Sequence, residues 1–65
     1  MIRVNGEEKM LEEETSLLEF LGQERYQTAR IAVEKNGEIV PKSRYGETLL
    51  RDGDALEIVS FVGGG

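Results

Sequence analysis

The chain has 65 residues, a formal net charge of −5 and 38% hydrophobic residues, with neither cysteine nor histidine. This length predicts one domain with a small core, and the missing residue types exclude disulfides, thiol nucleophiles and imidazole bases or metal ligands. The acidic balance argues against nucleic acid or an anionic membrane as partner, since both select clustered Lys and Arg. With no long apolar stretch and no signal-peptide pattern, the chain is expected to be cytoplasmic.

The first predicted element is a β-hairpin. Ile2 and Val4 fall on one side of an extended segment, and Asn5-Gly6 is a strong signal for a tight turn because both residues tolerate positive φ. A return strand is expected over residues 7–13, with Met10 and Leu11 as its apolar residues. The acidic run at residues 12–14 is interpreted as a solvated stretch before a helix, because consecutive strand residues point to alternate faces and do not converge on one metal ion.

A helix is predicted to follow. Ser16 is placed as its N-cap, with Glu19 three residues later completing a capping box. The helix is expected to end at Gly22, or alternatively to continue through residue 24 or 25. Its apolar stripe at helical spacing predicts the core contact, through Leu17, Phe20 and Leu21.

A second hairpin is predicted over residues 30–41. Ile31 and Val33 alternate with more exposed positions, Asn36-Gly37 forms the turn, and Pro41 marks the end of the return strand. Residues 42–50 are expected to be irregular with a tight turn near the start, and residues 51–54 (RDGD) to form another turn.

The last strand is expected over residues 55–62. Alternation places Leu56 and Ile58 toward the helix, and Val59 and Phe61 on the opposite face. These two apolar residues, together with Val62, are candidates for a partner-docking site, although isolated surface apolar residues are also normal. The element order predicts an α+β fold of the ubiquitin-like β-grasp type, a mixed sheet of four or five strands with one main helix packed on one face.

The chain ends in Gly63, Gly64 and Gly65. A β-grasp domain is expected over residues 1–62, and a flexible glycine tail over residues 63–65. Without a catalytic constellation, an enzyme acting alone is not expected, and neither a metal nor a bound cofactor is predicted. The reactive group that remains is the α-carboxylate of Gly65, which the glycines, having no side chains, can carry into a narrow partner channel.

The sequence resembles the ThiS family of sulfur carrier proteins of thiamine biosynthesis. The resemblance rests on IRVNGEE at the start, VEKNGEIVPKSRY in the centre, RDGDALEIV before the end and the terminal glycines. It implies that Gly65 is adenylated by an ATP-dependent E1-like enzyme and converted to a thiocarboxylate. It further implies a cysteine desulfurase and sulfurtransferase relay as sulfur source and thiazole synthase as recipient.

Three alternatives stay open. The small subunit of molybdopterin synthase resembles the chain in fold, tail and chemistry, and a carrier for another sulfur pathway fits the same features. The third is a β-grasp interaction module whose glycines have no chemical role.

Overall fold

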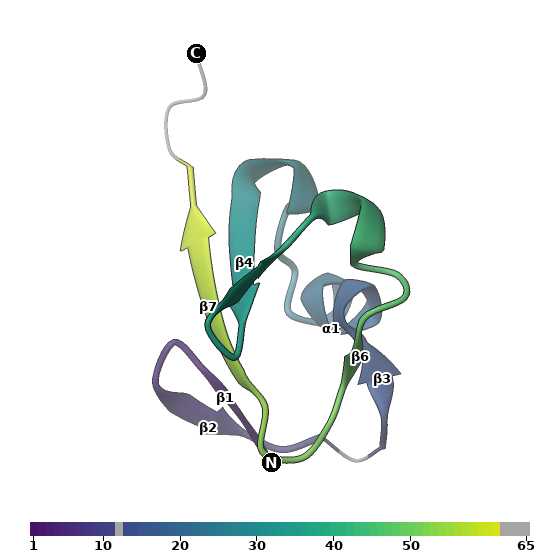
Figure 1. Cartoon of the computed structure of the whole chain (residues 1–65), viewed down its shortest axis with the longest axis vertical. Coiled ribbons are helices and arrows are strands. Elements are labelled where there is room, and N and C mark those ends of the chain that lie inside the picture. The colour runs from purple at the N-terminus through teal and green to yellow at the C-terminus, as the bar shows by residue number, and fades with distance from the viewer. Residues whose placement is uncertain (12, 62–65) are drawn as a thin grey trace.

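The centre of the fold is a mixed five-stranded sheet with a helix on one face (Figure 1). The computed structural model describes residues 1–11 and 13–61. The strand order is β2-β1-β7-β4-β5, in which β7 is parallel to β1 and antiparallel to β4. The α+β prediction with a central last strand is confirmed. The strand bounds are Ile2–Val4 for β1, Glu7–Lys9 for β2, Ile31–Lys35 for β4, Glu38–Val40 for β5 and Ala55–Ser60 for β7.

The remaining elements connect these strands. Helix α1 spans Leu17–Gln23, and short 3₁₀ helices span Thr28–Arg30 and Lys42–Arg44. Strands β3 (Thr15–Ser16) and β6 (Leu49–Leu50) form a separate antiparallel pair, which the sequence analysis did not predict because two residues show no alternation. Among the described residues, none of the helices has the length and apolar run needed to cross a membrane.

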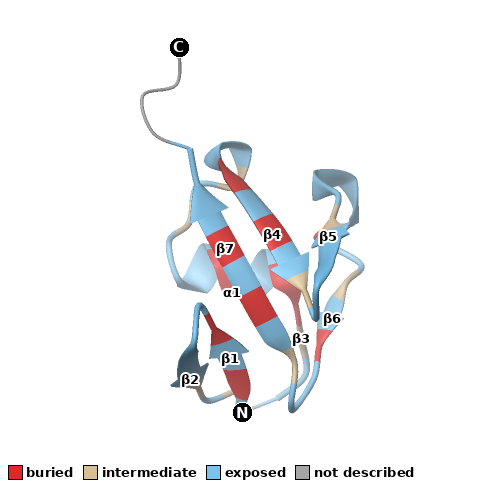
Figure 2. Ribbon diagram, turned by 60° about the vertical axis from the view of Figure 1, so that its left-hand side comes forward, coloured by how far each residue is buried: buried red, intermediate tan, exposed pale blue. Residues whose placement is uncertain are grey.

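The core lies between α1 and the inner face of the sheet. Buried residues alternate with exposed ones along β1, β4 and β7, as Figure 2 shows. The predicted stripe of α1 is buried, and so are Leu56 and Ile58 of β7. The core residues are Ile2, Val4, Leu17, Phe20, Leu21, Ile31, Val33, Tyr45, Leu50, Leu56 and Ile58.

Both Asn-Gly turns are bound to β7 by the asparagine side chain. Asn5 and Asn36 have φ values of 51° and 52°, as the predicted turns require. The Asn5 side chain accepts from Ile58 N at 2.7 Å and donates to Ile58 O at 3.2 Å. The Asn36 side chain accepts from Ala55 N at 2.9 Å and donates to the carboxylate of Asp54 at 3.0 Å. The turns therefore hold β7 as well as reversing the chain.

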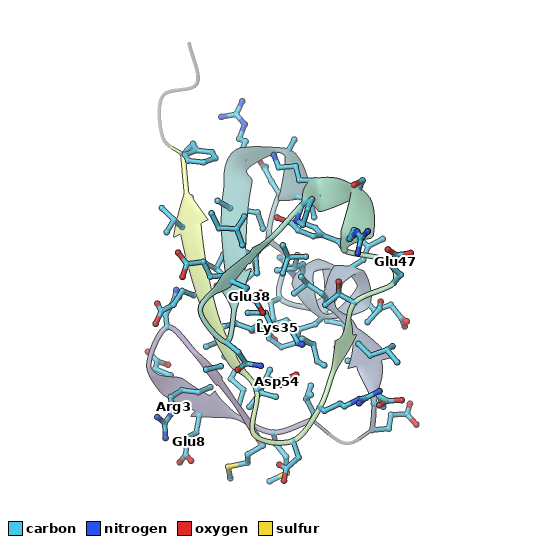
Figure 3. The ribbon with its side chains drawn as sticks, viewed as in Figure 1. Arg3, Glu8, Lys35, Glu38, Glu47 and Asp54 are labelled. Atoms are coloured by element: carbon cyan, nitrogen blue, oxygen red, sulfur yellow. The ribbon has the colours of Figure 1, made fainter. Side chains whose placement is uncertain are left out.

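Asp54 closes the predicted RDGD turn, where Gly53 has a φ of 92°. Its carboxylate accepts from Arg51 N at 2.8 Å and lies 3.9 Å from Lys35 Nζ; Figure 3 shows Lys35 and Asp54 near each other. Burial acts to raise the pKa of Asp54, but the hydrogen bonds from Asn36 and Arg51 and the nearby positive charges outweigh it, so this pKa lies below its ordinary value.

Two predicted strand ends are wrong. The return strand of the first hairpin ends at Lys9, which pairs with Ile2, because β1 offers no further strand residue. Met10 is therefore outside the strand and 73% exposed. Strand β7 ends at Ser60, where its neighbour β4 begins at Ile31; Val62, the predicted last residue, lies outside the described residues.

The helix begins where predicted and ends later than Gly22. Ser16 Oγ accepts from Glu19 N at 3.1 Å, while the Glu19 carboxylate faces the Ser16 hydroxyl at 3.4 Å and not the Ser16 backbone N–H. The N-cap is confirmed, but the reciprocal half of the capping box is not formed. At the other end the left-handed residue is Arg25, with a φ of 63°, so the longer alternative is nearer the structure.

Candidate functional site

The candidate site is the region where the chain leaves the sheet after β7. Phe61 N donates to Arg30 O at 2.7 Å, next to the Ile31–Ser60 pair that ends the β4–β7 ladder. In Figure 1 this end of β7 lies far from the N-terminus and the β1–β2 hairpin. One predicted docking residue and the three residues of the predicted glycine tail follow directly in the sequence. These residues, Val62, Gly63, Gly64 and Gly65, lie outside the described part of the structure.

The outer face of the sheet carries exposed apolar side chains beside this exit. Val59 is 59% exposed and Phe61 is 55% exposed, so the predicted exposure of both residues is confirmed. Ala32 of β4 pairs with Val59 and is also exposed. Ile39 of β5, 75% exposed, adds an apolar residue that the sequence analysis did not single out, although its alternation with the half-buried Val40 was a usable signal.

Two glutamates oppose each other within the same face. Glu34 of β4 pairs directly with Glu57 of β7, and Ile39 lies opposite Glu34 on the other side. Like charges in directly opposed positions destabilise a sheet. The outer face therefore combines apolar side chains with a repulsive acidic pair, which favours contact with a surface that is apolar and positively charged.

A groove lies at the base of the exit, on the side of the helix end. It contains two arginines that the sequence analysis missed, Arg25 and Arg30, and Phe61 forms part of its wall. The signal in the sequence is weak, because the two are five residues apart in a polar connection. The lining residues are Arg25, Tyr26, Gln27, Arg30, Ile31, Ser60 and Phe61.

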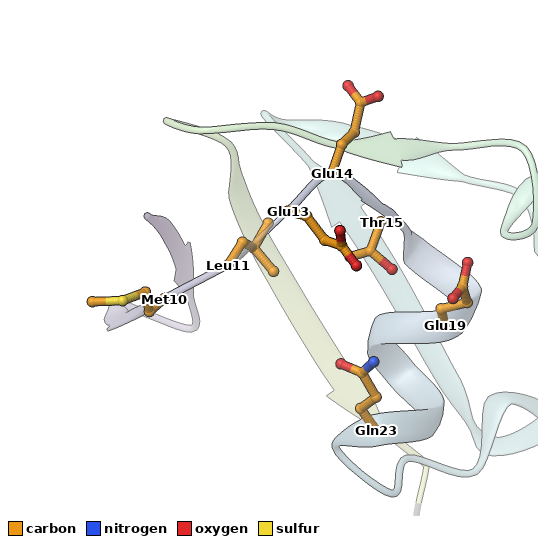
Figure 4. A pocket seen from close by; sticks show the side chains of 7 residues that line it. All are labelled: Met10, Leu11, Glu13, Glu14, Thr15, Glu19 and Gln23. Atoms are coloured by element: carbon orange, nitrogen blue, oxygen red, sulfur yellow. The ribbon is translucent and has the colours of Figure 1, made fainter.

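A second hollow lies between α1 and the segment before β3 (Figure 4). Three of its lining side chains are the carboxylates Glu13, Glu14 and Glu19, and Figure 4 shows Glu14 pointing away from Gln23. Among the residues that the structure describes, no group of three or more potential ligands is placed to hold a metal ion. The described lining of the hollow contains no paired nucleophile and base, so these side chains indicate no specific chemistry.

Comparison with known proteins identifies the family. The sequence model of the ThiS family matches residues 2–65, which includes the terminal glycines. The chain belongs to the ThiS family. It is 38% identical over 66 residues to the sulfur carrier protein ThiS of Bacillus subtilis, with the whole of both chains covered.

A solved structure supports the assignment. The crystal structure of a thiamine biosynthesis protein, ThiS, from Geobacter metallireducens matches this ThiS-family chain with a TM-score of 0.84 at 33% identity. The match covers 98% of this chain and 97% of that chain. The β-grasp fold is thereby confirmed.

Longer proteins contain a similar segment. The chain is 45% identical over 62 residues to the thiazole synthase of Paramagnetospirillum magneticum, and 36% identical over 64 residues to that of Magnetococcus marinus. It spans only 19% and 20% of the lengths of these two relatives. The similarity therefore concerns a carrier-sized segment of each.

Proposed function

We propose that this chain is a sulfur carrier protein of thiamine biosynthesis, with the carboxylate of Gly65 as the group that carries sulfur. The observation that supports it most strongly is the ThiS family match over residues 2–65. Because the chain contains no cysteine or histidine, the sulfur chemistry belongs to partner enzymes, and the chain acts as a protein co-substrate.

The first step is activation of the terminus. An E1-like enzyme binds the carrier and ATP, and a carboxylate oxygen of Gly65 attacks the α-phosphorus of ATP while pyrophosphate leaves. This forms an acyl-adenylate. The terminal sulfur of a persulfide, formed from cysteine on the desulfurase and sulfurtransferase relay, then attacks the carbonyl carbon and AMP leaves. A thiol reduces the resulting acyl disulfide, so that Gly65 becomes a thiocarboxylate and the thiol ends in a disulfide.

The partner that receives the sulfur is thiazole synthase. Support comes from the two relatives named thiazole synthase, each of which contains a segment similar to this chain. Joining a carrier segment to its acceptor in one polypeptide raises the effective concentration of one for the other. We infer that the separate carrier meets the same class of enzyme by diffusion.

Docking is assigned to the outer face around the exit. Val59 and Phe61 provide apolar contacts, and Val62, next in sequence, extends them. Four residues follow Phe61, and in extended form they reach about 13–14 Å. This length allows Gly63 and Gly64 to lie within a channel while Val59 and Phe61 stay at its entrance.

The deciding experiment is intact-mass analysis of the carrier after incubation with its activating enzyme, ATP, cysteine, the sulfur relay and a thiol reductant. In the wild-type chain we expect one terminal oxygen to be replaced by sulfur. In a variant that lacks Gly65 we expect no sulfur-bearing species. A Gly65→Ala variant should fold normally but be activated poorly. Absence of the sulfur-bearing species from the wild type, with an activating enzyme shown to be competent on another carrier, would refute the proposal.

A further inference from the structure

The residue that follows the C-cap of α1 is an arginine whose backbone conformation favours glycine. Arg25 has a φ of 63°, and two hydrogen bonds complete a Schellman motif, from Arg25 N to Gly22 O at 3.1 Å and from Tyr26 N to Leu21 O at 2.9 Å. The other described non-glycine residues with positive φ are asparagines, which adopt it readily. At Arg25 a side chain is present where a glycine would relieve the steric conflict.

The second arginine is fixed to the base of the C-terminal segment. Arg30 ends a 3₁₀ helix, and its carbonyl accepts the hydrogen bond from Phe61 N. Its position is thus tied to the point where the chain leaves the sheet. Arg25 and Arg30 are both exposed and line the same groove beside Phe61.

This groove is positive in a chain whose net charge is −5. Its described lining contains no carboxylate. Within residues 1–11 and 13–61, neither Arg25 nor Arg30 forms an ion pair, whereas Arg44 and Arg51 each pair with a glutamate. Two guanidinium groups are therefore held at the exit of the chain with their donors available to an external anion.

We propose that Arg25 and Arg30 bind carboxylate side chains of the activating enzyme at the mouth of the channel that admits the terminal glycines. The proposal rests on the proposed carrier function, which requires the terminus to enter such a channel. Guanidinium groups match carboxylates through paired, charge-assisted hydrogen bonds. A glycine at residue 25 would end the helix with less strain but would provide no such contact.

The length of the C-terminal segment indicates that the groove binds carboxylates of the enzyme and not the phosphates of ATP. The nucleotide must meet the carboxylate of Gly65, which lies four residues beyond Phe61, or about 13–14 Å away when extended. The groove at the base of this segment therefore stays outside the channel. The groove therefore faces the surface of the enzyme around the channel entrance.

The test compares binding of carrier variants to the activating enzyme in the absence and in the presence of ATP, measured by surface plasmon resonance at two salt concentrations. We expect Arg25→Gly to weaken binding about fivefold, and Arg25→Gly with Arg30→Gln to weaken it about 20-fold, chiefly through slower association and with a smaller salt dependence. The urea midpoint of Arg25→Gly should equal or exceed that of the wild type, so unfolding does not explain the loss. Arg3→Gln is the matched control for Arg25→Gly, since Arg3 lies on β1 far from the exit (Figure 3) and each of these two substitutions removes one positive charge.

Each outcome has one reading. Wild-type affinity of the double variant overturns the proposal, as does an equal loss in Arg3→Gln, which would indicate a general charge effect. A loss that appears only with ATP also overturns it and assigns the arginines to the nucleotide phosphates. Failure of the wild type to gain sulfur in the intact-mass experiment would refute the carrier function. The binding comparison without ATP does not depend on sulfur transfer, so it tests the arginine contact separately.

Discussion

Replacing Asn5 by glycine tests whether the side chain of the first turn holds the central strand. Glycine accepts the φ of 51° found at this position, so the turn itself should survive. What is lost is a pair of hydrogen bonds, in which the Asn5 side-chain amide accepts from the backbone N–H of Ile58 and donates to the C=O of Ile58. These bonds join residues 53 positions apart, between the start of the chain and its last strand.

The expected cost follows from these two bonds. Each contributes about 0.5–1.5 kcal/mol when partly buried, so the substitution should lower the free energy of unfolding by about 2 kcal/mol. A domain of this size has a net stability of about 3–5 kcal/mol, and its melting temperature falls by about 4–8 °C per kcal/mol. A decrease of about 8–16 °C is therefore expected. Asn5→Ala should cost roughly 1 kcal/mol more, because alanine tolerates positive φ poorly.

Urea denaturation followed by far-UV circular dichroism measures this effect, since the chain has no tryptophan for fluorescence. Asn36→Gly is the matched control: its side chain also binds β7, but at an exposed site, so we expect a loss below about 1 kcal/mol. If Asn5→Gly unfolds within about 0.5 kcal/mol of the wild type, the turn side chain does not hold β7 and the reasoning fails.

Three further predictions concern the core, the acid range and the docking face. Leu21→Ala, at a fully buried position, should cost about 2–5 kcal/mol and leave much of the protein unfolded at 25 °C by circular dichroism. Asp54 has a lowered pKa when folded, so its ionised form stabilises the fold above the unfolded pKa of about 3.9 and loses this effect as pH falls through the folded value. Urea titrations should therefore show the stability gap between wild type and Asp54→Asn narrowing below about pH 4; a constant gap would contradict this. Val59→Ser with Phe61→Ser should leave the melting temperature within a few degrees but weaken enzyme binding at least about tenfold by calorimetry, and unchanged binding would remove these residues from the docking site.

The sequence predicted the fold where local chemistry determines it. The Asn-Gly turns, the N-cap at Ser16 and the alternation of Leu56 and Ile58 each depend on residues that are neighbours in the chain. The central position of β7 followed from element order alone. The proposed site lies at the end of β7, so the alternation along this strand also predicted the exposed apolar residues of the site.

The missed features depend on contacts between distant residues. The β3–β6 pair forms because the chain returns to Thr15 and Ser16 after 33 residues, which no local pattern shows. The left-handed residue at the helix end is Arg25 and not Gly22, because α1 continues through Gln23 with Glu24 as its C-cap. The groove with Arg30 arises only when β7 pairs with β4 and brings Phe61 beside it.

The parallel pairing of β1 with β7 has a mechanical consequence. Arg3 N donates to Asp54 O and Asn5 N to Leu56 O, each at 2.9 Å, so these bonds lie across the direction in which the two ends of the chain would be pulled apart. A pulling force between the ends therefore acts on all the β1–β7 hydrogen bonds at once, in shear. In an antiparallel hairpin pulled at its two ends, the hydrogen bonds break one at a time. A partner that grips the last residues can thus draw them in, and release them, against a strand that resists being peeled from the sheet.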